Sequence, residues 1–125
     1  MGALSLVVDG AVRSKKNSQR ILRNRKSGKP FIAQSKQHDS WAAKAIWQIK
    51  IQRRGITLER PVNMAAVIYV DRHGADLLNL LAAVSDALEA GGAVANDRLI
   101  VGLNGSRMEK DAARPRAEIT LTEVA

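Results

Sequence analysis

Acidic and amide side chains gather in one stretch of a chain that is otherwise strongly basic, with a formal net charge of +8 at pH 7. The stretch contains Asp71, Asp76, Asp86, Asn96 and Asp97. Mg2+ prefers hard oxygen ligands, and a bound Mg2+ neutralises phosphate, activates a water and stabilises a leaving oxygen. Acids set against a basic background therefore indicate a divalent metal held against a polyanion, which is the arrangement of a metal-dependent nuclease.

Asp76 and Asp97 are the acids best placed to share a Mg2+ or Mn2+ ion as catalytic residues. Asp76 falls at a predicted strand–helix junction, and Asp97 falls in a loop that can fold back over the start of that helix. Asp86 follows Asp76 by nearly three turns, about 15 Å of helix rise, which exceeds a single metal shell. Asp71 is therefore the safer third ligand, and Asp86 is the alternative. Each acid also has an ordinary structural interpretation, as a helix cap, a solvated helix residue or a turn residue.

The excess positive charge lies in one N-terminal segment. Between Asp9 and Asp39 the chain has no acid and nine Lys or Arg residues. Such a block suits phosphate contacts driven by counterion release, although a solvated surface loop is the alternative. We expect nucleic-acid contacts from the polar residues of this segment, namely Arg13, Lys15, Lys16, Asn17, Arg20, Arg23, Arg25, Lys26 and Lys29.

Aromatic side chains are scarce, and this bears on the form of nucleic acid. The whole set is Phe31, Trp41, Trp47 and Tyr69. Proteins that bind single strands without sequence preference use several aromatic platforms on which bases stack. The scarcity favours recognition of the backbone and shape of duplex or branched DNA.

Composition excludes several other classes of protein. A chain of 125 residues fits one domain, residues 1–125. It contains no cysteine, which excludes a disulfide framework and a thiolate metal site. No apolar run is long enough to span a membrane, and no signal peptide is recognisable. We therefore expect a cytoplasmic protein that does not contact a membrane.

Hydrophobic periodicity and turn residues predict an α+β fold. We expect strands at residues 4–9, 62–70, 99–103 and 117–124, and a basic hairpin whose strands, 20–24 and 31–34, flank a turn at 26–29. One helix begins near residue 35 or 37 and stops at Gly55, and a second runs over 77–90 with Asp76 as its cap. The elements predict a small mixed sheet packed by two main helices.

The two predicted helices each have a distinctive exposed side. In the first, Ala43, Trp47 and Ile51 lie nearly opposite the stripe formed by Ala42, Ala45, Ile46 and Ile49. A helix that is apolar on two sides is covered on both, by its own domain on one side and by a further layer of that domain or a second subunit on the other. We expect a C2 dimer that uses Trp47 and Ile51. In the second helix, the side away from the core carries Leu78, Asn79, Ala82, Ser85, Asp86 and Glu89. That side would form one wall of a site if the helix lines a groove.

The spacing of these motifs resembles that of the RusA family of Holliday junction resolvases. The resemblance is carried by Asp76-Leu77-Leu78-Asn79, by Asp86-Ala87-Leu88, by Gly92 and by the run from Asn96 to Ile100. The basic segment at residues 14–20 is similar to the N-terminal basic loop of that family. The resemblance implies a homodimeric, Mg2+-dependent endonuclease of bacterial or phage type, which cuts four-way DNA junctions in recombination and repair.

The match to the family motif is incomplete at the positions that carry chemistry. The first and last family acids fall on Asp76 and Asp97, but the second falls on Leu78 and the helix lysine on Ala82. The first acid of the family's paired acids falls on Asn96, which can still donate an oxygen ligand. Two hypotheses follow: a structure-selective endonuclease in which Asp86 replaces the lost ligand, or a catalytically impaired protein that binds DNA junctions or duplexes. Asn17, Asn79 and Asn96 are expected to support orientation in the site.

Overall fold

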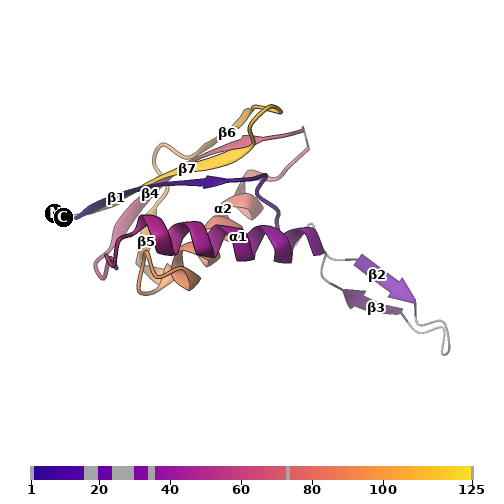
Figure 1. The fold of residues 1–125 in the computed structure, drawn as a ribbon, viewed down its shortest axis with the longest axis horizontal. Coiled ribbons are helices and arrows are strands. Elements are labelled where there is room, and N and C mark those ends of the chain that lie inside the picture. Colours follow the sequence, from indigo (N-terminus) through magenta and orange to yellow (C-terminus); the bar gives the residue numbers. More distant parts are fainter. Residues whose placement is uncertain (1, 16–19, 24–29, 34–35, 73, 125) are drawn as a thin grey trace.

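The computed structural model describes residues 2–15, 20–23, 30–33, 36–72 and 74–124, with only the backbone described at 20–23 and 30–33. Its elements follow one another as shown in Figure 1. In chain order they are β1 (Ala3–Asp9), β2 (Arg20–Arg23), β3 (Pro30–Ala33), α1 (Lys36–Gln52), β4 (Val62–Val70), α2 (Leu77–Ala90), the 3-10 turn η1 (Asp97–Leu99), β5 (Ile100–Gly102), β6 (Arg107–Lys110) and β7 (Arg116–Glu123).

The main sheet is mixed, as the sequence predicted. It has five strands, with the path β1-β7-β4-β5, and β6 also pairs with β4. Pairing is antiparallel between β1 and β7 and between β7 and β4, whereas β5 and β6 both run parallel to β4. β5 pairs with the first residues of β4 and β6 with the last, so the two short strands share one edge. The fold is therefore α+β, and both main helices lie where the sequence predicted them.

Alternation along the strands directs one face of the sheet into the core. In β4, Val62, Met64, Ala66 and Ile68 are fully buried, while the residues between them are half-buried. The same alternation in β7 buries Ile119 and Leu121 and exposes Thr120 and Thr122. Side chains of both helices join these residues in one core cluster. The two helices thus form a second layer against the sheet.

The buried face of α1 is rotated from the predicted stripe. Its buried residues are His38, Trp41, Ala45 and Ile49, while Ala42 and Ile46 are only half-buried. α1 also packs closely against the end of α2. A Cβ atom placed on Gly91 would lie 2.7 Å from Cγ2 of Ile49, so the absence of a side chain at Gly91 permits this contact.

Two glutamine side chains of α1 cover the outer edge of β1. The side-chain amide of Gln52 accepts from the backbone N–H of Val7 (2.8 Å) and donates to its carbonyl oxygen (2.6 Å). Gln48 makes the same pair of bonds with Asp9, at 2.8 and 3.2 Å. An open strand edge is a template for pairing with another chain. The glutamines satisfy part of this edge and fix α1 to the sheet.

The predicted basic hairpin is confirmed in its strands. β2 and β3 pair antiparallel, with Arg20 opposite Ala33 and Arg23 opposite Pro30. Figure 1 shows this pair beyond the N-terminal end of α1, away from the main sheet. The predicted turn at residues 26–29 lies outside the described residues.

The structure departs most from the sequence prediction at the end of α1, at the start of β5 and in the strand β6. α1 ends at Gln52, and Arg54 and Gly55 follow with positive φ angles of 49° and 76°. The predicted strand at 99–103 is shortened because η1 takes up Leu99. β6 was not predicted, since all four of its residues are exposed and its sequence has no apolar alternation. Among the described residues, no helix combines the length and apolar character needed to cross a membrane.

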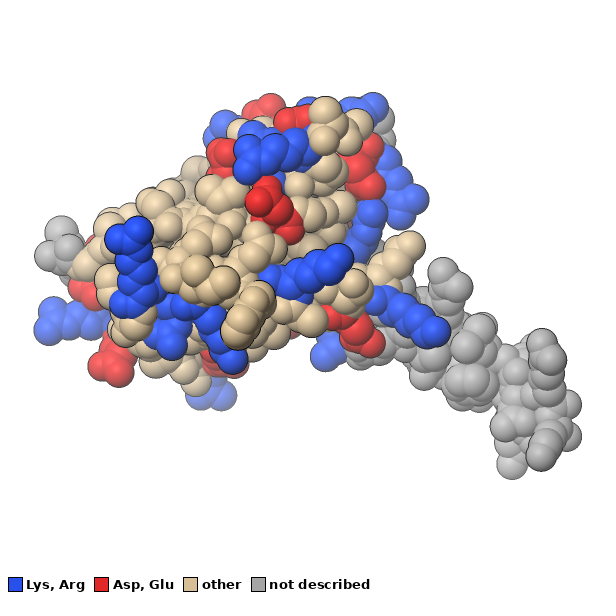
Figure 2. All heavy atoms as spheres, viewed as in Figure 1, with Lys and Arg blue, Asp and Glu red and all other residues tan. Residues whose placement is uncertain are grey.

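Charges are paired at one end of the sheet and unpaired over α1. Arg116 bridges Asp111 (2.9 Å) and Glu118 (3.0 Å), and its guanidinium lies 3.7 Å from the ring centroid of Tyr69. Further ion pairs near the same end join Arg107 to Glu109 and Arg114 to Asp9. Figure 2 shows blue and red side chains mixed over the β6–β7 end, whereas blue side chains extend along the front, where α1 runs.

Replacing Gln52 by Ala should lower the free energy of unfolding by about 1 kcal/mol, because two hydrogen bonds to Val7 are lost while water can reach the exposed edge. Gln52→Glu should cost at least as much, since a carboxylate would face the carbonyl of Val7. Urea denaturation measures both changes. Lys50→Ala, on the exposed side of the same helix, is the matched control, and equal midpoints for all three variants would contradict the role of Gln52.

Candidate functional site

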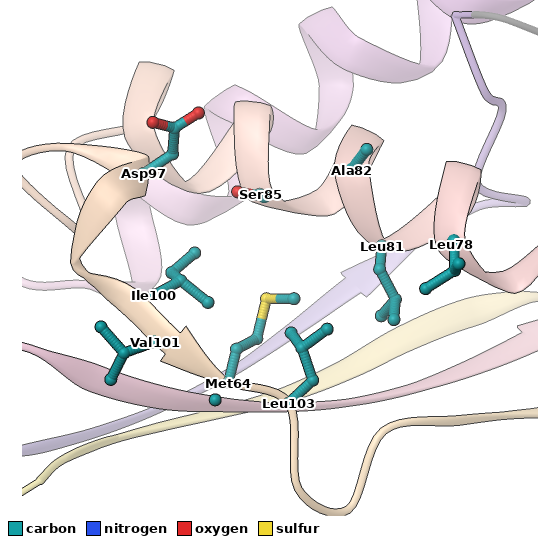
Figure 3. A pocket seen from close by; sticks show the side chains of 10 residues that line it. Met64, Leu78, Leu81, Ala82, Ser85, Asp97, Ile100, Val101 and Leu103 are labelled. Atoms are coloured by element: carbon teal, nitrogen blue, oxygen red, sulfur yellow. The ribbon is translucent and has the colours of Figure 1, made fainter.

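A groove of about 550 Å³ lies between α2 and β5. Leu78, Ala82 and Ser85 line it from α2, at spacings of four and three residues that place them on one side of the helix. Figure 3 shows these side chains in a row, with Met64 of β4 beneath them. The remaining lining residues are Leu81, Asp97, Ile100, Val101, Gly102 and Leu103. The exposed side of α2 therefore forms one wall of a groove, as the sequence suggested.

Asp97 reaches the groove because the loop after α2 folds back onto that helix. Asn96 caps η1, and its Oδ1 accepts from the backbone N–H of Arg98 at 2.9 Å. The backbone N–H of Asp97 donates to Oε1 of Glu89 at 3.0 Å, which ties the loop to the last turn of α2. The Asp97 side chain is exposed and lies at the Ser85 end of the groove (Figure 3). Asn96 thus caps the turn that carries Asp97, and its predicted role as a supporting residue of the site stays a prediction.

Asp76 performs the capping role that the sequence also offered. Its Oδ1 accepts from the backbone N–H groups of Leu78 (3.0 Å) and Asn79 (3.5 Å) at the start of α2. Glu89, which binds the loop of Asp97, follows Asp76 by about 20 Å of helix rise. Asp76 and Asp97 therefore lie towards opposite ends of α2, and Asp76 is not part of the groove lining.

The remaining predicted acids do not complete a metal shell with Asp97. Asp86 is exposed on α2 and does not line the groove. The described residues, which include Asp71, Asp76, Asp86 and Asp97, contain no group of three or more acids or histidines placed to hold a metal ion. One chain thus forms neither predicted three-acid set. The physical reason is the length of α2, which holds its two ends apart.

Asp71 is occupied by an ion pair that the sequence did not reveal. Both of its carboxylate oxygens accept from the guanidinium of Arg13, at 2.9 and 3.3 Å. The hydrogen bond from Arg13 is the main cause that lowers the pKa of Asp71 below its ordinary value of 3.8, against a smaller opposing effect of burial. Arg13 was expected to bind phosphate and Asp71 to bind metal, but here each neutralises the other. Arg13 and Asp71 are 58 residues apart in the sequence, so no pattern of neighbouring residues predicts their ion pair.

The start of the basic segment is held in place by a buried histidine. Nδ1 of His38 lies 2.7 Å from the carbonyl oxygen of Arg13, and Ser14 is buried beside it in sequence. The contact joins the chain entering the β2–β3 hairpin to α1, which follows the hairpin. His38 was not singled out in the sequence, because a histidine in the first turn of a helix gives no sign of burial.

Asn79, predicted as a supporting residue of the site, is half-buried at the start of α2. Of the other predicted nucleic-acid contacts, Lys15 is exposed. The backbone of Arg20 and Arg23 lies in β2. The other contacts predicted for this segment lie outside the described residues, namely Lys16, Asn17, Arg25, Lys26 and Lys29.

Comparison with known proteins adds no assignment to this geometry. No protein-family model matches the sequence, and no curated protein is significantly similar to it.

Asp71→Asn should lower stability at neutral pH by about 1 kcal/mol, the upper range for a partly exposed ion pair. The folded-state pKa of Asp71 is lowered, so its stabilisation is present above the unfolded pKa and is lost as pH falls through the folded pKa. The stability difference between wild type and Asp71→Asn should therefore shrink below about pH 4, as urea denaturation from pH 2 to 7 would measure. Arg13→Gln should show the same pH profile, and a constant difference down to pH 2 would refute the assignment.

Proposed function

We propose that this chain is a RusA-like DNA-binding protein that recognises branched or duplex DNA. One observation carries the proposal: the groove gathers Leu78, Ala82 and Asp97. At these positions the resemblance expects the second acid, the helix lysine and the last acid of the family site. Leu78 and Ala82 are neighbours on one side of α2, and Asp97 joins them because its loop folds back onto that helix.

The chemistry of the groove favours binding without cleavage. Its lining is mostly apolar, and among the described residues Asp97 is the single carboxylate that lines it. Leu78 presents an exposed aliphatic side chain where a ligand oxygen is needed, and Ala82 presents no cation. Mg2+ requires hard oxygen ligands in near-octahedral geometry. The described residues of one chain therefore do not fit a Mg2+ site like that of the family.

The basic composition supports DNA as the ligand. The net charge of +8 and pI of about 10.5 are in the range of nucleic-acid-binding domains. The basic segment of residues 13–36 leads into and out of the β2–β3 hairpin. Affinity that arises from phosphate contacts falls steeply with salt, which gives the proposal a direct signature.

A metal-dependent, structure-selective endonuclease is the second candidate, with Mg2+ or Mn2+ as its cofactor. The observation that favours it is the exposed carboxylate of Asp97 at the groove, where substrate phosphate would supply further oxygen ligands. Both candidate functions predict DNA binding, but only the endonuclease predicts DNA cleavage.

Labelled four-way junctions and linear duplexes should bind the wild-type protein with strong salt dependence and remain uncut with Mg2+ or Mn2+. Gel-shift and cleavage assays on the same samples measure both properties. Asp97→Asn should leave binding within about twofold. If the wild type cuts DNA and both Asp97→Asn and Asp76→Asn lose this cleavage, the endonuclease is established instead. The asparagine of Asp76→Asn would retain an oxygen that can cap α2, so this variant tests the chemistry rather than the folding.

The double variant Leu78→Asp, Ala82→Lys should gain Mn2+-dependent cleavage, because it places a carboxylate and an ammonium group in the groove with Asp97. Leu78 is 70% exposed, so its replacement should change stability by less than about 0.5 kcal/mol. Adding Asp97→Asn should abolish the gained activity. Leu103→Asp, which puts one carboxylate on the opposite wall, is the control that should remain inactive. A correctly folded double variant without activity would count against the RusA-like arrangement.

A further inference from the structure

The outer face of α1 carries an exposed tryptophan between two lysines. Trp47 is 66% exposed, and Lys44 and Lys50, three residues before and after it, are exposed as well. At 3.6 residues per turn both lysines lie within about 60° of Trp47 around the helix axis. Exposed Arg54 follows the end of the helix. One uncovered surface thus combines an aromatic ring with several cations.

These cations are available to an anionic ligand. Among the described residues, the ion pairs are formed by Arg13, Arg107, Arg114 and Arg116. Within the same part of the chain, Lys44, Lys50 and Arg54 form none. The only acid of α1 is Asp39, two turns before Trp47. Figure 2 shows blue side chains along the front of the body, where α1 runs.

We propose that this face of α1 is a second nucleic-acid contact, in which Trp47 stacks on an unpaired base while Lys44 and Lys50 bind the flanking phosphates. Stacking on an aromatic ring beside cations is the common way to hold single-stranded nucleic acid. The inference rests on the proposed function and adds a preference of the protein among DNA structures. DNA with unpaired bases, as at a branch point or in a single strand, gains a contact with Trp47 that a blunt duplex lacks.

Charge argues against a second copy of the chain as the occupant. Symmetric antiparallel packing of two α1 helices about Trp47 would oppose Lys44 of one copy to Lys50 of the other, twice. Like charges held together are destabilising, and here no acid of the face compensates them. The exposed Trp47, which the sequence placed with Ile51 in a dimer contact, is therefore assigned to a polyanion instead.

Trp47→Ala should weaken binding of oligodeoxythymidine about tenfold, which corresponds to ~1.4 kcal/mol of base stacking. Its affinity for a blunt duplex and for heparin, which offer no free base, should stay within twofold. Fluorescence anisotropy of labelled DNA measures the first two affinities. Trp47→Phe should restore most of the binding. Wild-type tryptophan emission should be quenched by oligodeoxythymidine, and the quenching should vanish in Trp47→Phe, because the remaining Trp41 is buried.

Lys50→Glu should reduce the slope of log K against log salt for oligodeoxythymidine by about 0.7, the value for one lost phosphate contact on a single strand. Lys110→Glu on β6 makes the same charge change at an exposed lysine and should leave the slope unchanged. Equal effects of the two variants would overturn the proposal, since they would reflect net charge alone.

Three further outcomes separate the alternatives. If wild type binds no DNA, the proposed function and this inference both fail. If junction and duplex binding persist while Trp47→Ala and Lys50→Glu bind oligodeoxythymidine like wild type, only this inference fails. A wild-type dimer in analytical ultracentrifugation that Trp47→Ala converts to a monomer would assign the face to a second copy and overturn the inference.

Discussion

The position of α1 against the sheet is the constraint on which the other features depend. Hydrogen bonds from Gln48 and Gln52 hold one side of the helix against the outer edge of β1. On another side, Ile49 packs where Gly91 leaves no side chain. These contacts fix the rotation of α1 about its own axis. The same rotation turns Trp41 into the core and Trp47 to the surface. The side chains that α1 exposes to a ligand therefore depend on the contacts of Gln48, Gln52 and Gly91.

The groove between α2 and β5 has a shape that does not depend on charged side chains. Its shape depends on apolar packing of Met64, Leu81 and Ile100 and on the turn that Asn96 caps. None of these contacts requires a carboxylate or an ammonium group at the positions of Leu78 and Ala82. The groove can therefore form around an apolar wall, because burial of hydrocarbon stabilises the fold. Asp76 lies outside the groove and caps α2.

Electrostatics divides the surface into a neutralised end and a free cationic face. At the β6–β7 end, arginines lie between acids and beside Tyr69, and their charge is largely used within the molecule. Over α1, Lys44 and Lys50 are exposed and form none of the ion pairs seen among the described residues. Counterion release rewards only cations that are free to approach phosphate. The net charge of the chain thus overstates the number of cations that can bind DNA phosphates. The arrangement of ion pairs determines where the remaining cations lie.

Local sequence was sufficient for most elements of the fold. The limits of β4 and α2 and the capping role of Asp76 follow from apolar periodicity and turn residues, which act between residues close in the chain. The exposed four-residue β6 carries no such signal, because its pairing with β4 comes from backbone bonds rather than from side-chain pattern. The end of α1 was misjudged because Arg54 and Gly55 continue as a turn after the helix hydrogen bonds stop.

The candidate site required the tertiary structure. Sequence named Asp71, Asp76, Asp86 and Asp97 as potential partners, since spacing shows which acids are present but not how far apart a helix holds them. Folding paired Asp71 with Arg13, left Asp76 at one end of α2 and brought Asp97 to the other. It also placed Leu78, Ala82 and Asp97 around one groove. Residue types determine the interactions that are possible, whereas the rigid length of α2 and contacts between distant segments decide which of them form.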